Sequence, residues 1–159
     1  MADTYVQAYF HIVFAIKNRQ ALIQKRWKDE LEKYVSTIVQ NHGHKLIAIG
    51  SMPDHIHIFL GYKLTQTIPK LVEEIKTSSN AWIKEKELSR FKFDWQKGYG
   101  AFTHSHSQID TVAKYVLNQE AHHKKKSFRR EYIEMLNNLQ IEYNDKYVFE
   151  FFSDVRGWE

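Results

Sequence analysis

The sequence predicts an α+β fold of the ferredoxin-like type, a four-stranded antiparallel sheet with helices on one face. Three observations support this prediction. Strand-like and helix-like segments follow one another in the order β-α-β-β-α-β, with further helices after them. Two of the strand-like segments are separated only by a short turn at Pro53-Asp54, which favours an antiparallel hairpin. A length of 159 residues favours a single domain over residues 1–159.

The first half of the chain supplies three of the four strands. Residues 4–16 alternate in polarity and are rich in Tyr, Val, Phe and Ile, so they are predicted to form the first strand. Residues 25–41 are predicted to form a helix that ends near Gly43. Its apolar residues at helical spacing are Trp27, Leu31, Tyr34, Val35, Ile38 and Val39. Residues 45–51 and 55–62 are the predicted hairpin strands.

The second half begins with a helix over residues 67–86, where Thr67 is a candidate N-cap and Pro69 lies in the first turn. Residues 91–103 are predicted to form the fourth strand, bulged around Gly98 and Gly100. A third helix starts at residues 107–110 and carries Val112, Tyr115, Val116 and Gln119. A fourth, C-terminal helix is predicted over residues 128–139.

Composition excludes several classes of function. The chain has no cysteine, so disulfides, zinc-thiolate sites and cysteine nucleophiles are absent, in keeping with a cytoplasmic protein. Its six glycines form no phosphate-binding loop, which argues against a nucleotide cofactor. No apolar run approaches the roughly 20 residues that cross a bilayer, and no secretion signal is recognisable, so no membrane partner is expected. A net charge of +4 with 14% aromatic residues is typical of nucleic-acid binding.

Two histidines stand two residues apart in the strand-like run Asp54-His55-Ile56-His57-Ile58. Side chains alternate faces along a strand, so His55 and His57 point the same way. An isolated pair of this kind is most simply explained as two inert, half-buried histidines. With a third ligand from another element, the pair would instead hold Mg²⁺, Mn²⁺ or a similar ion.

A tyrosine and a glutamine lie four residues apart on the predicted third helix and therefore share one helical face. Tyr115 is a candidate nucleophile, and Gln119 is a candidate oxygen ligand. A phenol has a pKa near 10, so attack at neutral pH needs help from a cation or a base. Without a metal nearby, a half-buried structural tyrosine and a surface glutamine are the simpler interpretation.

Taken together, these motifs resemble the HUH single-tyrosine transposases of small bacterial insertion sequences (the IS200-like superfamily). The residues that carry the resemblance are Asp54-His55-Ile56-His57-Ile58-Phe59 and Tyr115-Val116-Leu117-Asn118-Gln119-Glu120-Ala121-His122-His123, with Ser51-Met52-Pro53 and Trp95-Gln96-Lys97-Gly98-Tyr99-Gly100. They extend over most of residues 4–140. The joint occurrence of the histidine pair and the tyrosine–glutamine helix is far more specific than either motif alone.

The resemblance implies a function and roles for individual residues. It implies a metal-dependent transposase that cleaves and rejoins single-stranded DNA through a 5′-phosphotyrosine and recognises hairpins at element ends. His55, His57 and Gln119 would hold a divalent ion, Mg²⁺ or Mn²⁺, and Tyr115 would attack the scissile phosphate. The resemblance also implies a homodimer, in which the tyrosine helix of one subunit can complete the site of the other.

Two alternatives stay open. A catalytically silent or domesticated relative would bind hairpin DNA without cutting it, and a metabolic or regulatory dimer of the same fold would bind no nucleic acid. A related enzyme acting on dispersed palindromic repeats is a further possibility within the transposase class.

Several other charged and histidine residues have less definite roles. A basic block after the tyrosine helix is a candidate DNA-backbone contact or a solvated helix junction. It consists of Lys124, Lys125, Lys126, Arg129 and Arg130. His104, His106, His122 and His123 receive no definite role. His11 is expected to face the sheet or solvent, with proximity to the metal as the less favoured alternative.

Overall fold

The computed structural model describes residues 3–152, 155 and 157–158, and its strands form one antiparallel sheet in the order β2-β3-β1-β4. The strand bounds are β1 Tyr9–Ala15, β2 Lys45–Met52, β3 His55–Gly61 and β4 Gly100–His104. The pairing of β2 with β3 confirms the predicted hairpin. Element order and antiparallel pairing together confirm the α+β fold that the sequence predicts.

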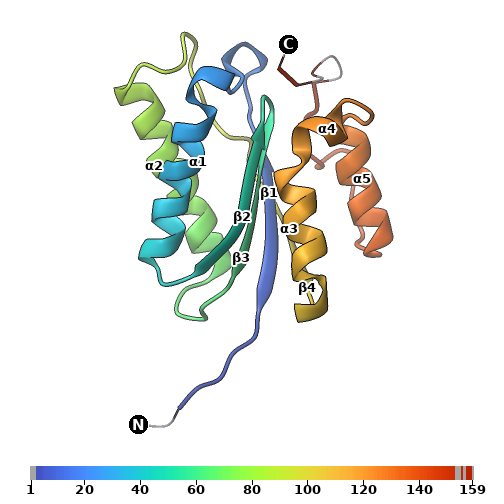
Figure 1. Cartoon of the computed structure of the whole chain (residues 1–159). Helices are drawn as coiled ribbons and strands as arrows, with labels where there is room; N and C mark the ends of the chain where they lie inside the picture. The colour runs from blue at the N-terminus through green and yellow to red at the C-terminus, as the bar shows by residue number, and fades with distance from the viewer. Residues whose placement is uncertain (1–2, 153–154, 156, 159) are drawn as a thin grey trace.

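Helices cover both faces of this sheet (Figure 1). One face carries α1 (Lys25–Asn41) and α2 (Ile68–Glu85), as expected for the β-α-β-β-α-β unit. The C-terminal helices α3 (Ile109–Leu117), α4 (Gln119–His123) and α5 (Phe128–Asn138) lie on the opposite side, together with the face of β3 that bears the histidines. Short 3₁₀ turns at Arg19–Ala21 and His106–Gln108 connect the elements.

The alternation of side chains along β3 divides its residues between two hydrophobic clusters. Ile56, Ile58 and Leu60 belong to the large core that also contains the apolar sides of α1 and α2. Phe59 belongs to a smaller cluster with Ala48 and with Val112 and Val116 of α3. A single strand thus contributes to the main core with one face and supports the third helix with the other.

Two strands are shorter in the structure than the sequence predicts. The first strand begins at Tyr9 rather than Thr4, and the fourth covers only Gly100–His104. Within the predicted segment 91–103, an isolated bridge joins Trp95 to Ile16, and the chain turns at Gly98, whose φ is +87°. Phe93 and Trp95 pack into the core instead, and the Trp95 ring lies edge-on against Phe14 at 4.8 Å between centroids.

Gly50 on β2 allows α3 and α4 to approach the histidine strand closely. A Cβ atom at Gly50 would lie 2.3 Å from the carbonyl oxygen of Val116 and 3.7 Å from Cγ of Gln119. The first distance is far inside van der Waals contact, and the obstructing atom belongs to the backbone. The absence of a side chain here therefore sets how near the tyrosine helix comes to the sheet.

We expect Gly50→Ala to destabilise the protein by about 2 kcal/mol, because over-packing a tight contact forces backbone shifts. Chemical denaturation measures this change. Gly61→Ala on the neighbouring strand is the matched control: its added Cβ would meet nothing closer than 3.5 Å. A Gly50→Ala protein as stable as the Gly61→Ala protein would contradict the close approach of α3.

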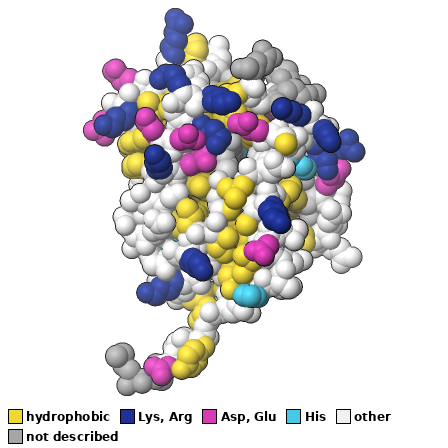
Figure 2. All heavy atoms as spheres, in the orientation of Figure 1, with side chains coloured by type: hydrophobic (Ala, Val, Ile, Leu, Met, Phe, Trp, Pro, Cys, Tyr) yellow, Lys and Arg dark blue, Asp and Glu magenta, His cyan; other side chains and the backbone are white. Residues whose placement is uncertain are grey.

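Figure 2 shows the surface in the same orientation. Hydrophobic side chains gather along the middle of this face, and many of the charged side chains lie above them. Partly buried Ile47 and Ile49 belong to β2, which is an edge strand of the sheet. Among the described residues, no helix combines the length and apolarity needed to cross a membrane.

Candidate active site

Strand β3 positions two histidine side chains on the face covered by the C-terminal helices. His55 and His57 are 1% and 0% exposed, and their ring centroids lie 4.9 Å apart. Pairing fixes both positions, because His55 lies opposite Ala15 and His57 opposite Val13 on the central strand β1. The predicted orientation of the two rings toward one side is confirmed.

Each histidine uses its Nδ1 atom for a buried contact with another side chain. His55 Nδ1 lies 2.7 Å from Oδ1 of Asp54, and His57 Nδ1 lies 2.7 Å from Nε2 of His11. Such partners fix the tautomer and the orientation of a metal-binding imidazole. They leave the two Nε2 atoms directed at the interior of the site. His11 therefore contacts the histidine pair directly, and the favoured expectation that it faces sheet or solvent is wrong in this respect.

The tyrosine and the glutamine come from two helices rather than one. The predicted third helix ends at Leu117, and Asn118 separates it from α4, which begins at Gln119. The two residues nevertheless stay together, because the Gln119 side-chain amide donates to the carbonyl oxygen of Tyr115 at 3.1 Å. Gln119 Oε1 lies 3.4 Å from Nε2 of His55 and 2.9 Å from Nε2 of His123.

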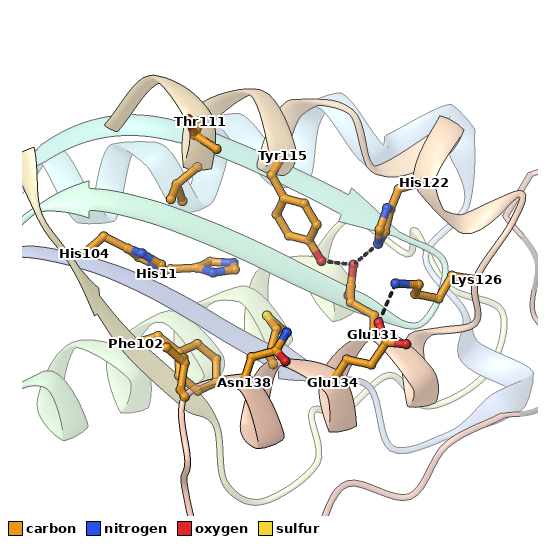
Figure 3. Close-up of a pocket in the computed structure, with 13 residues that line it drawn as sticks. His11, Phe102, His104, Thr111, Tyr115, His122, Lys126, Glu131, Glu134 and Asn138 are labelled. Atoms are coloured by element: carbon orange, nitrogen blue, oxygen red, sulfur yellow. Dashed lines mark hydrogen bonds and ion pairs between the residues drawn. The ribbon is translucent and has the colours of Figure 1, made fainter. Parts of the chain in front are cut away.

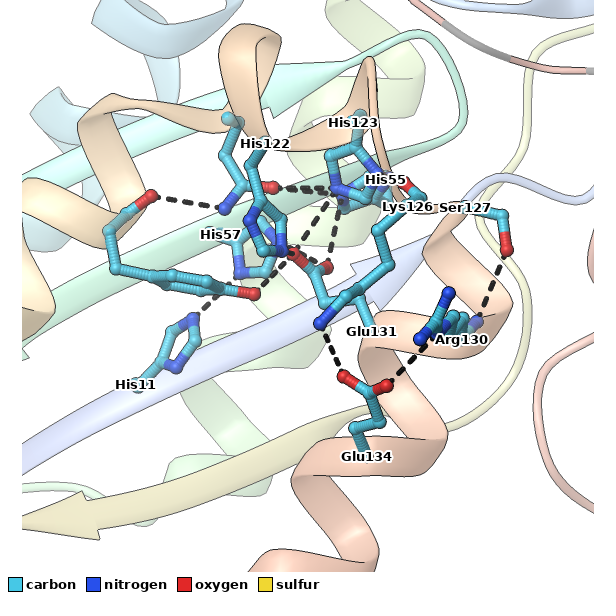
Figure 4. Close-up of polar contacts among 12 residues, drawn as sticks. His11, His55, His57, His122, His123, Lys126, Ser127, Arg130, Glu131 and Glu134 are labelled. Carbon is cyan, nitrogen blue, oxygen red and sulfur yellow. Dashed lines mark hydrogen bonds and ion pairs between the residues drawn. The ribbon is translucent and has the colours of Figure 1, made fainter.

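Glu131 of α5 stands at the centre of the cluster, although it is not among the site residues predicted from the sequence (Figure 4). Its Oε1 atom lies 3.2 Å from Nε2 of His57 and 3.7 Å from Nε2 of His55. Its Oε2 atom lies 3.2 Å from Nε2 of both His122 and His123. The sequence does contain a signal, since Glu131 falls on the apolar side of a predicted helix. The other buried residues of that side are Phe128, Tyr132 and Leu136.

The donor set fits a divalent metal ion. One ligand atom from each of His55, His57, His123 and Glu131 lies within 4.8 Å of the others, and all four residues are buried. Imidazole nitrogens combined with a carboxylate oxygen are ligands that transition-metal ions accept. Burial lowers the pKa of His57, against the opposing influence of Glu131, and thereby favours the neutral ring that a metal requires.

Tyr115 belongs to the same site within one chain. Its hydroxyl donates to Oε2 of Glu131, and its ring centroid lies 5.8 Å from that of His57. Burial and the neighbouring carboxylate raise the pKa of Tyr115. Burial alone would also raise the pKa of Glu131, but His57 and the nearby His122 and His123 hold it well below its usual range. The resting site thus pairs a protonated phenol with an ionised carboxylate.

The other candidate residues, those of the basic block and His106, are exposed or contact acidic or aromatic side chains. Lys124 and Lys125 are exposed, whereas Lys126 and Arg130 pair with Glu134 on α5. Arg129 lies over the ring of Phe151, 5.9 Å from its centroid. His106 is exposed, and its ring centroid is 6.1 Å from that of Tyr9. Glu134 therefore partly neutralises the basic block, and the two lysines at its start are exposed.

We expect Glu131→Ala to destabilise the protein by about 3 kcal/mol in the presence of a chelator. The change removes the buried acceptor of Tyr115 and leaves the facing imidazoles without their carboxylate partner. The free energy of unfolding from urea titration measures this effect. Glu134→Ala, one turn along the helix and in an exposed ion pair, should leave the midpoint nearly unchanged. Equal midpoints for the two variants would contradict a structural role for the buried carboxylate.

Known proteins share both this sequence pattern and this fold. The chain is 26% identical over 118 residues to the ISDra2 transposase TnpA of Deinococcus radiodurans, an alignment covering 71% of the chain and 84% of that protein. A crystal structure of a transposase from the same organism superimposes with a TM-score of 0.57 at 24% identity, covering 75% of this chain and 96% of the other. A REP-associated tyrosine transposase, solved bound to a REP hairpin, matches with a TM-score of 0.59 at 12% identity, covering 100% and 96%. The model of the IS200-like transposase family matches residues 4–119, which include all four strands of the sheet, the tyrosine helix and Gln119, and the chain therefore belongs to this family of transposases.

Proposed function

We propose that this transposase cleaves and rejoins single-stranded DNA with Tyr115 as the nucleophile. The observation that carries the proposal is the position of the Tyr115 hydroxyl, which contacts Glu131 inside the cluster of His55, His57 and His123. In this proposal the nucleophile lies beside candidate metal ligands of its own chain, and a metal ion held there would offset the charge of the attacked phosphate.

His55, His57 and Gln119 are the proposed metal ligands, and Glu131 and His123 extend the set. Both Mg²⁺ and Mn²⁺ are candidates, and the preponderance of imidazole nitrogen favours Mn²⁺ over Mg²⁺, which prefers oxygen ligands. A divalent ion held there would polarise a phosphate oxygen and offset the negative charge of the transition state. Gln119 additionally ties the site to the tyrosine helix through its bond to the Tyr115 carbonyl.

In the proposed reaction, one bond to phosphorus forms, another breaks, and the phenolic proton moves to a neighbouring side chain. The Tyr115 oxygen forms a bond to phosphorus, and the bond from phosphorus to the 3′ oxygen breaks. The nearest acceptor for the phenolic proton is Oε2 of Glu131, and the departing 3′ oxygen takes a proton from solvent. The 5′-phosphotyrosine conserves the phosphodiester bond energy, so that attack by another 3′-OH rejoins the DNA without a nucleotide cofactor.

Hairpin DNA is the proposed partner. The similar REP-associated protein was solved with a REP hairpin, and exposed Lys124 and Lys125 follow directly after α4. Their charges, and those of Lys126, Arg129 and Arg130 when their acidic or aromatic neighbours release them, suit contacts to the phosphate backbone.

A homodimer through the apolar edge strand β2 is a further proposal, which light scattering after gel filtration would test.

A denaturing gel tests the proposal directly. The protein is incubated with Mn²⁺ and a labelled single-stranded oligonucleotide copied from the DNA that flanks its own gene, hairpin included. We expect a covalent adduct between the protein and the DNA on the 3′ side of the cut, and release of the strand on the 5′ side with a free 3′-OH. Hairpin binding without any adduct, in either Mn²⁺ or Mg²⁺, would instead support the catalytically silent alternative.

A further inference from the structure

A cavity of about 350 Å³ opens beside Tyr115, between α3 and α5 and over strands β1 and β4 (Figure 3). Its lining includes Tyr115 and Glu131 but neither His55 nor His57. The volume falls in the range of small-molecule pockets, roughly 300–1,000 Å³. The cavity therefore adjoins the proposed nucleophile and Glu131, while His55 and His57 lie outside its lining.

The walls of this cavity combine apolar surface with a few polar groups. Phe102 of β4 and Met135 of α5 supply apolar contacts, whereas His104 and Asn138 supply hydrogen-bonding groups from opposite sides (Figure 3). A nucleobase has matching chemistry, because its faces are apolar and flat and its edges carry donors and acceptors. A phosphate alone would not use the apolar part of the lining.

His104 gives an independent indication of a polar ligand. Its Nδ1 atom lies 3.4 Å from Oε1 of Gln108, whereas its buried Nε2 atom has no hydrogen-bond partner in the part of the chain that the structure describes. Buried polar atoms without partners are uncommon in native proteins. The metal cluster and the nucleophile do not account for this histidine.

Resting on the function proposed above, we propose that the cavity binds the base of a nucleotide that flanks the scissile phosphate, and that the enzyme thereby selects its cleavage site. The covalent structure of DNA limits how far such a base can lie from the reacting phosphate. Attack requires the phosphate to meet the Tyr115 hydroxyl, and each adjoining base is joined to that phosphate through a single sugar. A base so placed is within reach of a cavity that Tyr115 itself lines.

The test uses the wild-type protein with Mn²⁺ and variants of the oligonucleotide from its flanking DNA. One abasic residue replaces the nucleotide on the 5′ side of the cut, on the 3′ side, or at a single-stranded position several nucleotides away. We expect one of the two flanking replacements to slow adduct formation roughly tenfold, the size typical of a lost base contact. The distant replacement should change the rate less than about twofold.

Two tryptophan variants assign that loss to the cavity. Asn138→Trp fills the cavity, whereas Asn137→Trp places the same ring on the adjacent exposed position, which does not line it. The abasic penalty should fall below about twofold in Asn138→Trp and persist in Asn137→Trp. If neither abasic replacement beside the cut slows adduct formation, or if the penalty persists in Asn138→Trp, this inference is wrong while the proposed function stands. Absence of an adduct with the intact oligonucleotide would overturn the proposed function and this inference together.

Discussion

Tyr115→Phe is expected to abolish the covalent adduct, with a loss of at least roughly a thousandfold in the rate of adduct formation. The substitution removes only the oxygen that would form the bond to phosphorus and retains the ring packed near His57. The fold and the metal ligands stay in place, so hairpin DNA should bind within about twofold of wild type. A denaturing gel measures the adduct, and fluorescence anisotropy measures binding.

Tyr132→Phe is the matched control for this experiment. Tyr132 of α5 is also buried, and its ring contacts Phe128 and Phe149 in tilted arrangements. Burial raises its pKa to about 12, and it is not one of the residues that form the histidine–glutamate cluster. Adduct formation should be near wild type in Tyr132→Phe. Loss of binding and adduct together in Tyr115→Phe would indicate a structural tyrosine instead.

Removal of the metal is also expected to reduce the rate of adduct formation strongly. His57→Ala deletes a fully buried imidazole from the ligand set. It should weaken Mn²⁺ binding by about a hundredfold or more. Calorimetric titration measures the affinity. Adduct formation should fall in parallel and should also disappear when wild type is treated with a chelator.

Thermal unfolding provides a readout that does not depend on DNA cleavage. An ion that binds only the folded state stabilises it by about 2.7 kcal/mol at one hundred times its dissociation constant. Mn²⁺ should therefore raise the unfolding temperature of wild type and of His106→Ala, whose histidine is exposed and is not among the clustered ligands. The shift should vanish in His57→Ala. Equal shifts in all three proteins would place the ion elsewhere.

Some of the fold follows from local patterns alone. The helix over residues 25–41 has the predicted bounds, and the hairpin at Pro53-Asp54 follows from two apolar strands and the turn between them. The long fourth strand was mispredicted because an alternating aromatic segment has the same pattern whether it pairs in a sheet or packs into the core. Only the turn at Gly98 and the burial of Trp95 distinguish the two outcomes.

The sequence by itself determined the family, the α+β fold and two halves of the site. His55 and His57 share a face because strand side chains alternate, and Tyr115 and Gln119 lie four residues apart near a helix end. Tertiary structure alone decided that Glu131 joins the two halves and that His11 supports His57. These contacts span 16 to 74 residues of sequence, and no local periodicity records which distant side chains meet. Their formation depends on the packing of α5 and α3 on the sheet, where a close approach such as that at Gly50 fixes the distance between nucleophile and ligands.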